Sequence, residues 1–452
     1  MKQSKSLKKD LIRYVIPTVM SLWVFTLYSM VDGIFVARGA GELALASVNI
    51  SIPYINFIFA LSLIFSVGAS TMISISFGRG DKEKANRIFS MNTIVLVIAA
   101  VTMAVLSLIL LPQLANFLGA TDATRGMVME YLRYILLFSP CYIISYSFEI
   151  LVKVDGYPQL ATKTVILGAL TNCVLDYLFV IVWKQGVAGA AIATGLSQML
   201  TVLVYLKHFL GKKSKLSFVK CRPRLSVYRS MIPLGLSDGF TELSSGIVIF
   251  MFNHVVLSVA GDQGVACYTI AAYVNSLVVM TMVGVSQGMQ PLVGFHYGKE
   301  DRKACRSLYR YALIAVLLLS AASFAVVNLF AGGIVSLFLE EGSSQIFAEA
   351  VGAVKLFSFS FLVVGYNVVT AGYYAATERP TQSLIISVGR GLVLLAASLF
   401  PMAYFFGING IWLATLVSES ACLLLVFAVG RVSSRRKNLR NAQNTIPLSQ
   451  NS

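Results

Sequence analysis

The sequence has little charge. Asp, Glu, Lys and Arg make up 12% of the 452 residues, whereas hydrophobic residues make up 57%. An ordinary soluble domain carries about 25% charged residues. A chain this apolar cannot cover a water-exposed surface with polar side chains, which excludes a soluble globular protein. The composition therefore predicts an integral membrane protein.

Motifs of enzymes and metalloproteins are also missing. The sequence contains no GxxxxGK(S/T) phosphate loop and no HExxH. We therefore expect neither an enzyme nor direct coupling to ATP, and an ion gradient is left as the energy source. The six cysteines form no CxxC pair and the three histidines lie far apart. No metal or other cofactor is expected apart from Na⁺ or H⁺ as a coupling ion.

Long apolar stretches recur along the chain. A helix needs roughly 20 residues to cross about 30 Å of hydrocarbon. Twelve stretches satisfy this length, near 11–36, 46–77, 88–111, 131–152, 160–182, 187–207, 229–257, 266–296, 308–330, 351–376, 381–405 and 409–431. The first is too long for a signal peptide, so we interpret it as a retained transmembrane helix.

The basic residues orient these helices. Of the 36 Lys and Arg, 31 fall in the N-terminus, in alternate connections and in the C-terminal tail, and 5 on the opposite side. Because cytoplasmic loops are enriched in Lys and Arg, both termini are predicted in the cytoplasm of a multi-pass inner-membrane protein. This placement accounts for the net charge of +16 without nucleic acid as a partner. The expected partners are the lipid bilayer and small organic substrates.

An internal repeat divides the chain. FGRGDK at 77–82 resembles YGKEDR at 297–302, and GVAGAAIATGLSQ at 186–198 resembles GINGIWLATLVSE at 407–419. Each half holds six helices in the same order, so the repeats run parallel and are related by an axis along the membrane normal. Two such bundles enclose a central cleft, which is a common transporter plan.

The predicted fold is an all-α integral membrane protein with twelve transmembrane helices in two pseudo-symmetric six-helix lobes. The N-terminal lobe covers residues 1–208 and the C-terminal lobe covers residues 229–433. A basic cytoplasmic linker at 209–228 joins them. Residues 434–452 are predicted to form a short disordered cytoplasmic tail.

Placing an ionisable side chain inside hydrocarbon costs free energy, so each such residue within a span is a candidate for a functional role. Asn172 and Asp176 share one face of the fifth helix, and an antiparallel hairpin brings Thr194 to the depth of Asp176. Asp32 lies near the outer end of the first helix. Two carboxylates, an amide oxygen and a hydroxyl make a plausible Na⁺ site. Alternatively the two carboxyl groups share a proton, or they cap helices and pair with basic residues.

The C-terminal half has its own polar residues within spans. Asp238 and Glu242 lie on the seventh span, and Asn275 and Gln287 on the eighth. These side chains are candidates for a substrate or proton site, with helix–helix hydrogen bonding as the alternative. The repeat aligns Asp32 with Val248, so the acids do not repeat with the scaffold.

Several motifs together suggest a family. MVDGIFVAR in the first span, FGRGDKEKA in the loop after the second span, the Asn172/Asp176 pair and GVAGAAIAT at the start of the sixth helix resemble the multidrug and toxic compound extrusion family. The resemblance covers roughly residues 11–431. It implies a V-shaped pair of lobes that exports organic-cation or amphipathic drugs and toxic compounds by antiport with Na⁺ or H⁺.

The resemblance also implies roles for individual residues. Asp32, Asn172, Asp176 and Thr194 match the family's cation site in the N-terminal lobe. Pro17 resembles the first-helix proline at which some members bend, which implies a hinge. Some members have an aspartate deep in the tenth helix. Here that helix has Tyr366 and Asn367 instead, which remain candidates for a substrate or proton site.

Two alternatives remain open at this point. A flippase for a lipid-linked saccharide would use a similar two-lobe scaffold with a cleft rich in Arg and Lys. The in-span basic residues are few, namely Arg133, Lys355 and Arg390, and all are expected within reach of an interface. A membrane enzyme or sensor would need a catalytic motif or a soluble domain. The leading expectation is a monomeric, cation-coupled secondary active exporter.

Overall fold

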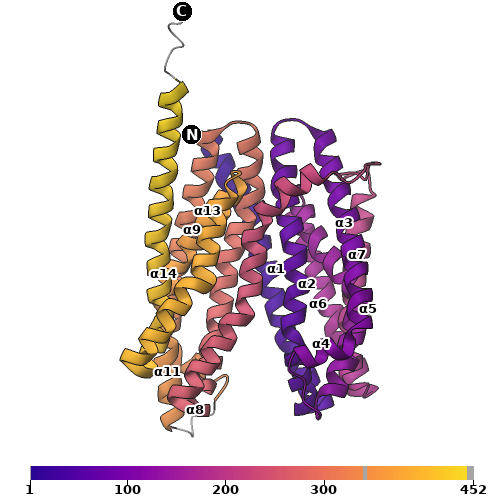
Figure 1. The fold of residues 1–452 in the computed structure, drawn as a ribbon, viewed down its shortest axis with the longest axis vertical. Coiled ribbons are helices and arrows are strands. Elements are labelled where there is room, and N and C mark those ends of the chain that lie inside the picture. Colours follow the sequence, from indigo (N-terminus) through magenta and orange to yellow (C-terminus); the bar gives the residue numbers. More distant parts are fainter. Residues whose placement is uncertain (1, 340–343, 445–452) are drawn as a thin grey trace, which may run out of the picture.

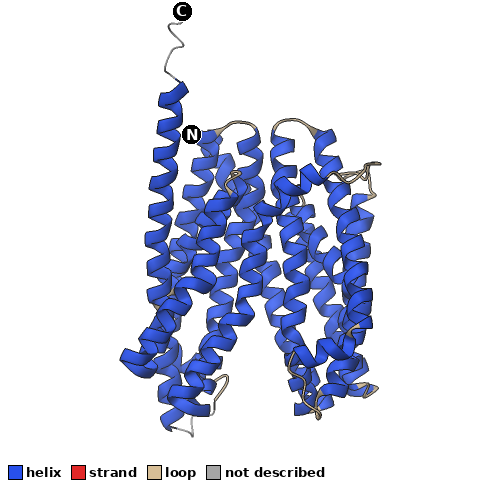
Figure 2. Ribbon diagram, viewed as in Figure 1, coloured by secondary structure: helices blue, strands red, loops and turns tan. Residues whose placement is uncertain are grey.

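The computed structural model describes residues 2–339 and 344–444, and in this part every element is helical (Figures 1 and 2). The first half consists of α1 (Lys2–Ala40), α2 (Glu42–Gly78), α3 (Lys82–Ile109), α4 (Leu111–Phe117), α5 (Arg125–Val154), α6 (Pro158–Asp176), the π-helix η1 (Tyr177–Val182) and α7 (Gly186–Phe209). The second half consists of α8 (Leu225–Gly298), α9 (Arg302–Leu329), α10 (Ala331–Val335), α11 (Ser344–Ser358), α12 (Phe361–Ala376), α13 (Pro380–Val388), the π-helix η2 (Gly389–Val393) and α14 (Leu394–Asn444).

The helices of the described residues correspond to twelve spans. Nine continuous helices are long and apolar enough to cross a membrane, and the pair α11 and α12, bent by 42°, adds a tenth. Two of the nine are double. α8 breaks at Gly261, where φ is 61°, and α14 breaks at Gly407, where φ is 57°. Because only glycine adopts such angles easily, each break is a sharp turn between two spans. The predicted twelve-helix fold is thus confirmed.

Two boundaries differ from the sequence-based expectation. α8 begins at Leu225, inside the segment predicted as a linker, and α14 continues to Asn444. The predicted disorder of the tail stays a prediction; residues 434–444 are drawn as helix, and residues 445–452 lie outside the described part. The composition accounts for the helix, because no Gly or Pro follows Gly430 up to Asn444 and Arg, Lys, Leu, Ala and Gln favour helix.

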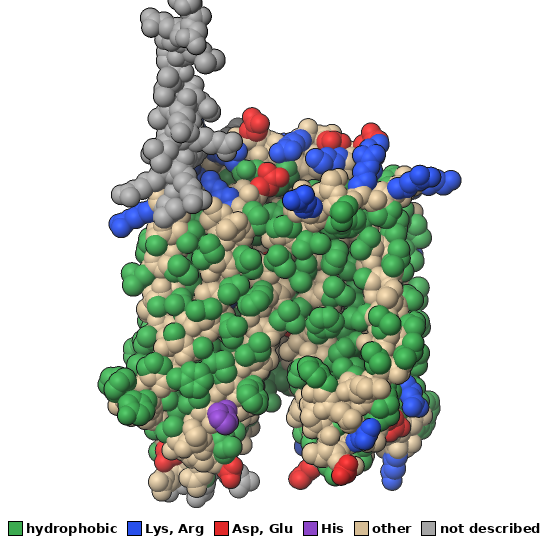
Figure 3. Space-filling view, in the orientation of Figure 1, with side chains coloured by type: hydrophobic (Ala, Val, Ile, Leu, Met, Phe, Trp, Pro, Cys, Tyr) green, Lys and Arg blue, Asp and Glu red, His purple; other side chains and the backbone are tan. Residues whose placement is uncertain are grey.

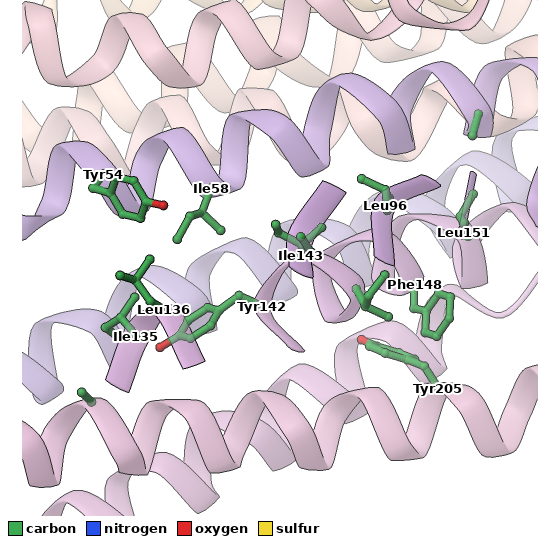
Figure 4. Packing of buried hydrophobic residues seen from close by; sticks show 14 of the residues in the cluster. Tyr54, Ile58, Leu96, Ile135, Leu136, Tyr142, Ile143, Phe148, Leu151 and Tyr205 are labelled. Carbon is green, nitrogen blue, oxygen red and sulfur yellow. The ribbon is translucent and has the colours of Figure 1, made fainter. Parts of the chain in front are cut away.

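The two halves form two bundles that touch at the end where both termini lie and separate towards the other end (Figures 1 and 3). Each bundle has its own buried apolar core. In the N-terminal lobe, Ile58, Leu96, Ile143, Phe148 and Tyr205 pack together from α2, α3, α5 and α7 (Figure 4). The outer surface is apolar over its middle, and most Lys and Arg visible in Figure 3 gather at the end that carries the termini. We call this the basic end.

The lobes meet through glycines that allow backbone to touch backbone. α2 packs along α8 from the basic end to about mid-depth. A Cβ atom placed on any of four glycines would lie about 2 Å from a carbonyl oxygen of the other lobe: Gly68 on Met231, Gly78 on Phe295, Gly235 on Ile64 and Gly298 on Ile75. Small residues are the usual means of such close helix packing in membranes. The close contact between the lobes, which we call the glycine seal, therefore requires residues without a side chain at these four positions.

The segment between the lobes is anchored to the N-terminal one. The carboxylate of Asp155, at the end of α5, is fully buried. Its Oδ1 accepts hydrogen bonds from the backbone N–H groups of Lys215 (2.8 Å) and Leu216 (2.9 Å), and its Oδ2 lies 2.8 Å from Nε2 of His208. This single carboxylate thus fixes where the connection leaves α7.

Candidate functional site

The N-terminal lobe gathers the residues predicted to bind a cation. Asp176 is the last residue of α6 before the π-helix η1, and Asn172 lies one turn earlier. The hairpin of α6 and α7 places Nδ2 of Asn172 3.2 Å from Oγ1 of Thr194, to which it donates. π-Helical turns are frequent at functional sites because they reorient side chains locally. Asp32 of α1 joins the group, since its carboxyl group interacts with that of Asp176.

These side chains carry oxygens without partners. Asp176 is 1% exposed and Asn172 is fully buried. Apart from the contact between the two carboxyl groups, both carboxylate oxygens of Asp176, Oδ1 of Asp32 and Oδ1 of Asn172 are buried and accept no hydrogen bond from any described residue. Unpaired buried polar atoms are costly, so several in one place call for a ligand. Carboxylate and amide oxygens suit a hard cation, and two adjacent carboxyl groups can also hold a proton.

A path of aromatic residues connects this group with the centre of the molecule. Tyr28 lies one helical turn from Asp32 on α1, so the two side chains share a face. Tyr28 also lines a small cavity of about 30 Å³ in the N-terminal lobe. Phe25 and Tyr146 line both this cavity and the larger one between the lobes. A change at the acidic group can therefore reach the central cavity through neighbouring side chains.

The central cavity measures about 350 Å³ and is lined mainly by the C-terminal lobe. Five of the polar candidates line it, namely Asp238, Glu242, Asn275, Gln287 and Asn367. The sixth, Tyr366, is not among the lining residues, and its ring lies 6.0 Å from that of Phe427. Neither Asp238 nor Glu242 forms an ion pair within the described part of the chain.

A buried ion pair in this cavity was not anticipated. Nε of Arg390, in η2, donates to Oε1 of Glu419 at 2.7 Å, and Nδ2 of Asn367 donates to Oε2 at 2.8 Å. The side chains of Arg390 and Glu419 are 14% and 6% exposed. The expectation that Arg390 lies within reach of an interface is therefore wrong. Arg390 is ten residues into the helix that starts at Pro380, or about 15 Å from the basic end.

Pro17 lies inside α1, which runs unbroken through it. Proline cannot donate the usual backbone hydrogen bond, so the helix is weakened there. The carbonyl oxygen of Pro17 instead accepts a hydrogen bond from Oγ1 of Thr162 at 2.6 Å, which ties α1 to α6. The role of Pro17 as a hinge stays a prediction.

Comparison with known proteins gives a consistent result. The MatE family model matches residues 17–178 and 239–399, once in each half. The multidrug export proteins MepA of Staphylococcus saprophyticus and Staphylococcus haemolyticus are 21% and 22% identical, and each alignment covers 94% of both chains.

Solved structures agree with the family match. An outward-facing multidrug resistance MATE family transporter of the MOP superfamily is 26% identical with a TM-score of 0.90, covering 95% of this chain and 97% of its own. A MOP superfamily transporter from Pyrococcus furiosus is 25% identical with a TM-score of 0.88, covering 94% and 96%. The two matched segments, the internal repeat and the two-lobe fold together show that this chain belongs to the MatE family.

Proposed function

We propose that this protein is a secondary active antiporter that exports organic-cation or amphipathic compounds in exchange for Na⁺ or H⁺. The observation that carries the proposal is the set of unpartnered buried oxygens of Asp32, Asn172 and Asp176 in one lobe. Beside it lies a cavity between two lobes that contains two unpaired carboxylates, Asp238 and Glu242. The first group suits a small cation, and the second suits an organic cation.

The coupling follows from differential binding. A cation at Asp32 and Asp176 shifts the equilibrium between conformations only by the difference in its affinity for them. The lobes separate at the end away from both termini (Figure 3). With the basic end in the cytoplasm, this conformation opens outward, so the coupling cation would enter from outside while substrate leaves. Both lobes and the cavity lie within one chain, which supports a monomer in the cell membrane.

A flippase for a lipid-linked saccharide is less well supported. Such a substrate is anionic and needs a cleft rich in Arg and Lys. Among the described residues that line the central cavity, Arg390 is basic, and Asp238, Glu242 and Glu419 are acidic. The acids outnumber the base, and the base is already paired with one of them. The cavity therefore favours a positively charged substrate.

The proposal is tested in proteoliposomes loaded with tetraphenylphosphonium, with an imposed gradient of Na⁺ or of H⁺. Stimulation of efflux by one gradient identifies the coupling ion. Asp32→Asn and Asp176→Asn should abolish the stimulation, because each removes a charge from the cation site. Asp122→Asn is the matched control, since Asp122 is exposed and far along the chain from either site.

A binding measurement separates coupling from transport. If Na⁺ is the ion, it should raise the thermal unfolding midpoint of the wild type in detergent but not that of Asp176→Asn. If H⁺ is the ion, proton release on substrate binding should disappear in the same variant. Full gradient-driven efflux from both Asp variants would refute the site, and no efflux from the wild type under either gradient would refute the function.

A further inference from the structure

The guanidinium group of Arg390 is held at one end and free at the other. Its Nε donates to Glu419, whose second carboxylate oxygen is fixed by Asn367. An arginine offers five N–H donors in a planar fork, and Nε supplies one of them. The two terminal Nη groups form no hydrogen bond with any described residue. Arg390 nevertheless lines the central cavity, where these donors are available to a ligand.

Other polar atoms around the cavity also lack partners. Ser244 is 2% exposed, and its hydroxyl forms no hydrogen bond with a described residue. It lies next to η2, since a Cβ atom on Gly391 would be 3.6 Å from that of Ser244. Oγ1 of Thr415, one turn before Glu419 on α14, is likewise unpartnered. Both residues line the cavity with Arg390 and can donate hydrogen bonds to an acceptor.

The internal repeat argues against a scaffold role for the ion pair. At separations of 221 or 222 positions, Glu419 corresponds to Gln198, Asn367 to Ser145 and Arg390 to Gly168. In the N-terminal lobe, Ser145 donates to Oε1 of Gln198 at 2.6 Å, so a neutral pair occupies the same place. The fold is thus built without charge there. A buried ion pair costs desolvation energy, which makes a purely structural purpose in the other lobe unattractive.

We propose that Arg390 is a receptor for the anionic group of a zwitterionic, amphipathic substrate. A carboxylate or sulfonate would accept hydrogen bonds from both Nη groups, the bidentate geometry that guanidinium groups favour. The cationic group of the same molecule would lie towards the unpaired Asp238 and Glu242. Glu419 and Asn367 are positioning residues, because they hold the guanidinium through Nε and leave the fork open.

The inference rests on the proposed function only in assuming that substrate occupies the central cavity. It adds that the cavity has two poles. Asp238 and Glu242 form a negative one on α8, and Arg390 forms a positive one on η2. A permanent cation without an acidic group would use the first pole alone. A zwitterion would use both.

The test compares two dyes that differ by one charge. Rhodamine B carries a cationic xanthylium ring and a free carboxylate, and its ethyl ester lacks the carboxylate charge. Fluorescence polarisation of each dye with the purified full-length protein gives two Kd values, and the readout is the ratio of ester Kd to acid Kd. A charge-assisted bidentate contact corresponds to a ratio on the order of tenfold or more in the wild type.

Three variants sharpen the test. Arg390→Gln combined with Glu419→Gln replaces the ion pair by two neutral amides and should bring the ratio close to one. Glu419→Gln alone should raise the ratio several-fold, because Arg390 loses its competing carboxylate. Arg390→Lys keeps the charge but loses the fork, so its ratio should be intermediate. If the double variant does not fold, as judged by size-exclusion chromatography, the two single variants decide.

A wild-type ratio at or below one overturns the proposal, and so does a ratio that none of the variants changes. The second result would mean that Arg390 and Glu419 serve the fold alone. Failure of the proposed function is recognised separately, because it appears as absent efflux of tetraphenylphosphonium, which carries no anionic group. If tetraphenylphosphonium is exported but the ratio of ester Kd to acid Kd is the same in the wild type and all variants, the exporter function is kept and Arg390 is rejected as an anion receptor.

Discussion

Replacing Gly298 by alanine should push the lobes apart at the basic end. A Cβ atom at this position would lie 2.1 Å from the carbonyl oxygen of Ile75 and 2.9 Å from its carbonyl carbon. Both obstacles are backbone atoms in the last turn of α2, so no side-chain rotation relieves the clash. An ordinary carbon–oxygen contact requires more than 3 Å, and the two helices must therefore separate by about 1 Å.

The energetic consequence is confined to one conformation. Overpacking of this kind costs about 1–3 kcal/mol where the helices are in contact. A conformation open at the basic end breaks the contact and escapes the cost. The equilibrium between the two should consequently shift by about 5- to 150-fold towards opening at the basic end.

The shift can be measured by pulsed electron spin resonance. Spin labels replace Lys82 and Lys303, both exposed beside the two loops at the basic end, in a cysteine-free background. The wild type should give a single short distance between them. Gly298→Ala should add or enlarge a population at longer distance, and efflux should change with it.

The matched control is Gly352→Ala, which also puts alanine into a helix but meets no atom within 4 Å. Its distance distribution should equal that of the wild type. An unaltered distribution in Gly298→Ala would refute the reasoning, because it would show that the seal between the lobes tolerates a side chain.

Three further predictions concern stability and are checked by thermal unfolding in detergent. Asp155→Ala strands the buried N–H of Leu216 and should cost about 1–3 kcal/mol per unpaired group, with faster proteolysis of the connection between the lobes; an unchanged midpoint and cleavage rate would contradict it. Phe148→Ala empties part of the N-terminal core and should cost about 3–5 kcal/mol, unless the core collapses to fill the space. Lys153→Met leaves the buried carboxylate of Glu149 without its partner at 2.8 Å and should destabilise strongly, whereas adding Glu149→Leu should recover most of the loss.

The fold could be predicted because its determinants are local or periodic. Apolar length identifies a span, and the side on which Lys and Arg fall orients it, without any knowledge of packing. The hairpin also predicted that Thr194 lies near the face shared by Asn172 and Asp176. The hydrogen bond in the structure joins Thr194 to Asn172, one turn from the residue whose depth was matched.

The C-terminal pair could not be predicted in the same way. Arg390 and Glu419 are 29 residues apart on different helices, and nothing in the chain specifies which faces of those helices meet. The assignment of Lys and Arg to the two sides of the membrane placed Arg390 with the cytoplasmic residues. It did not take into account that Arg390 lies about 15 Å along its helix from the basic end. The repeat contained the missing signal, because it aligns Arg390 with a glycine and Glu419 with a glutamine, a charge pair against a neutral pair.

The glycine turns at the end away from the termini limit how the molecule can move. Gly41, Gly261 and Gly407 each turn the chain from one span into the next within about one residue, at φ of 91°, 61° and 57°. Such joints leave no slack, so two consecutive spans cannot slide past each other along their axes. Each pair of spans joined in this way moves as one rigid body, so the two lobes can change their relative position only by rotating such pairs. These rigid pairs of helices are nearly as long as the membrane is thick. A small displacement of the helices at the glycine seal therefore becomes a large displacement at the open end.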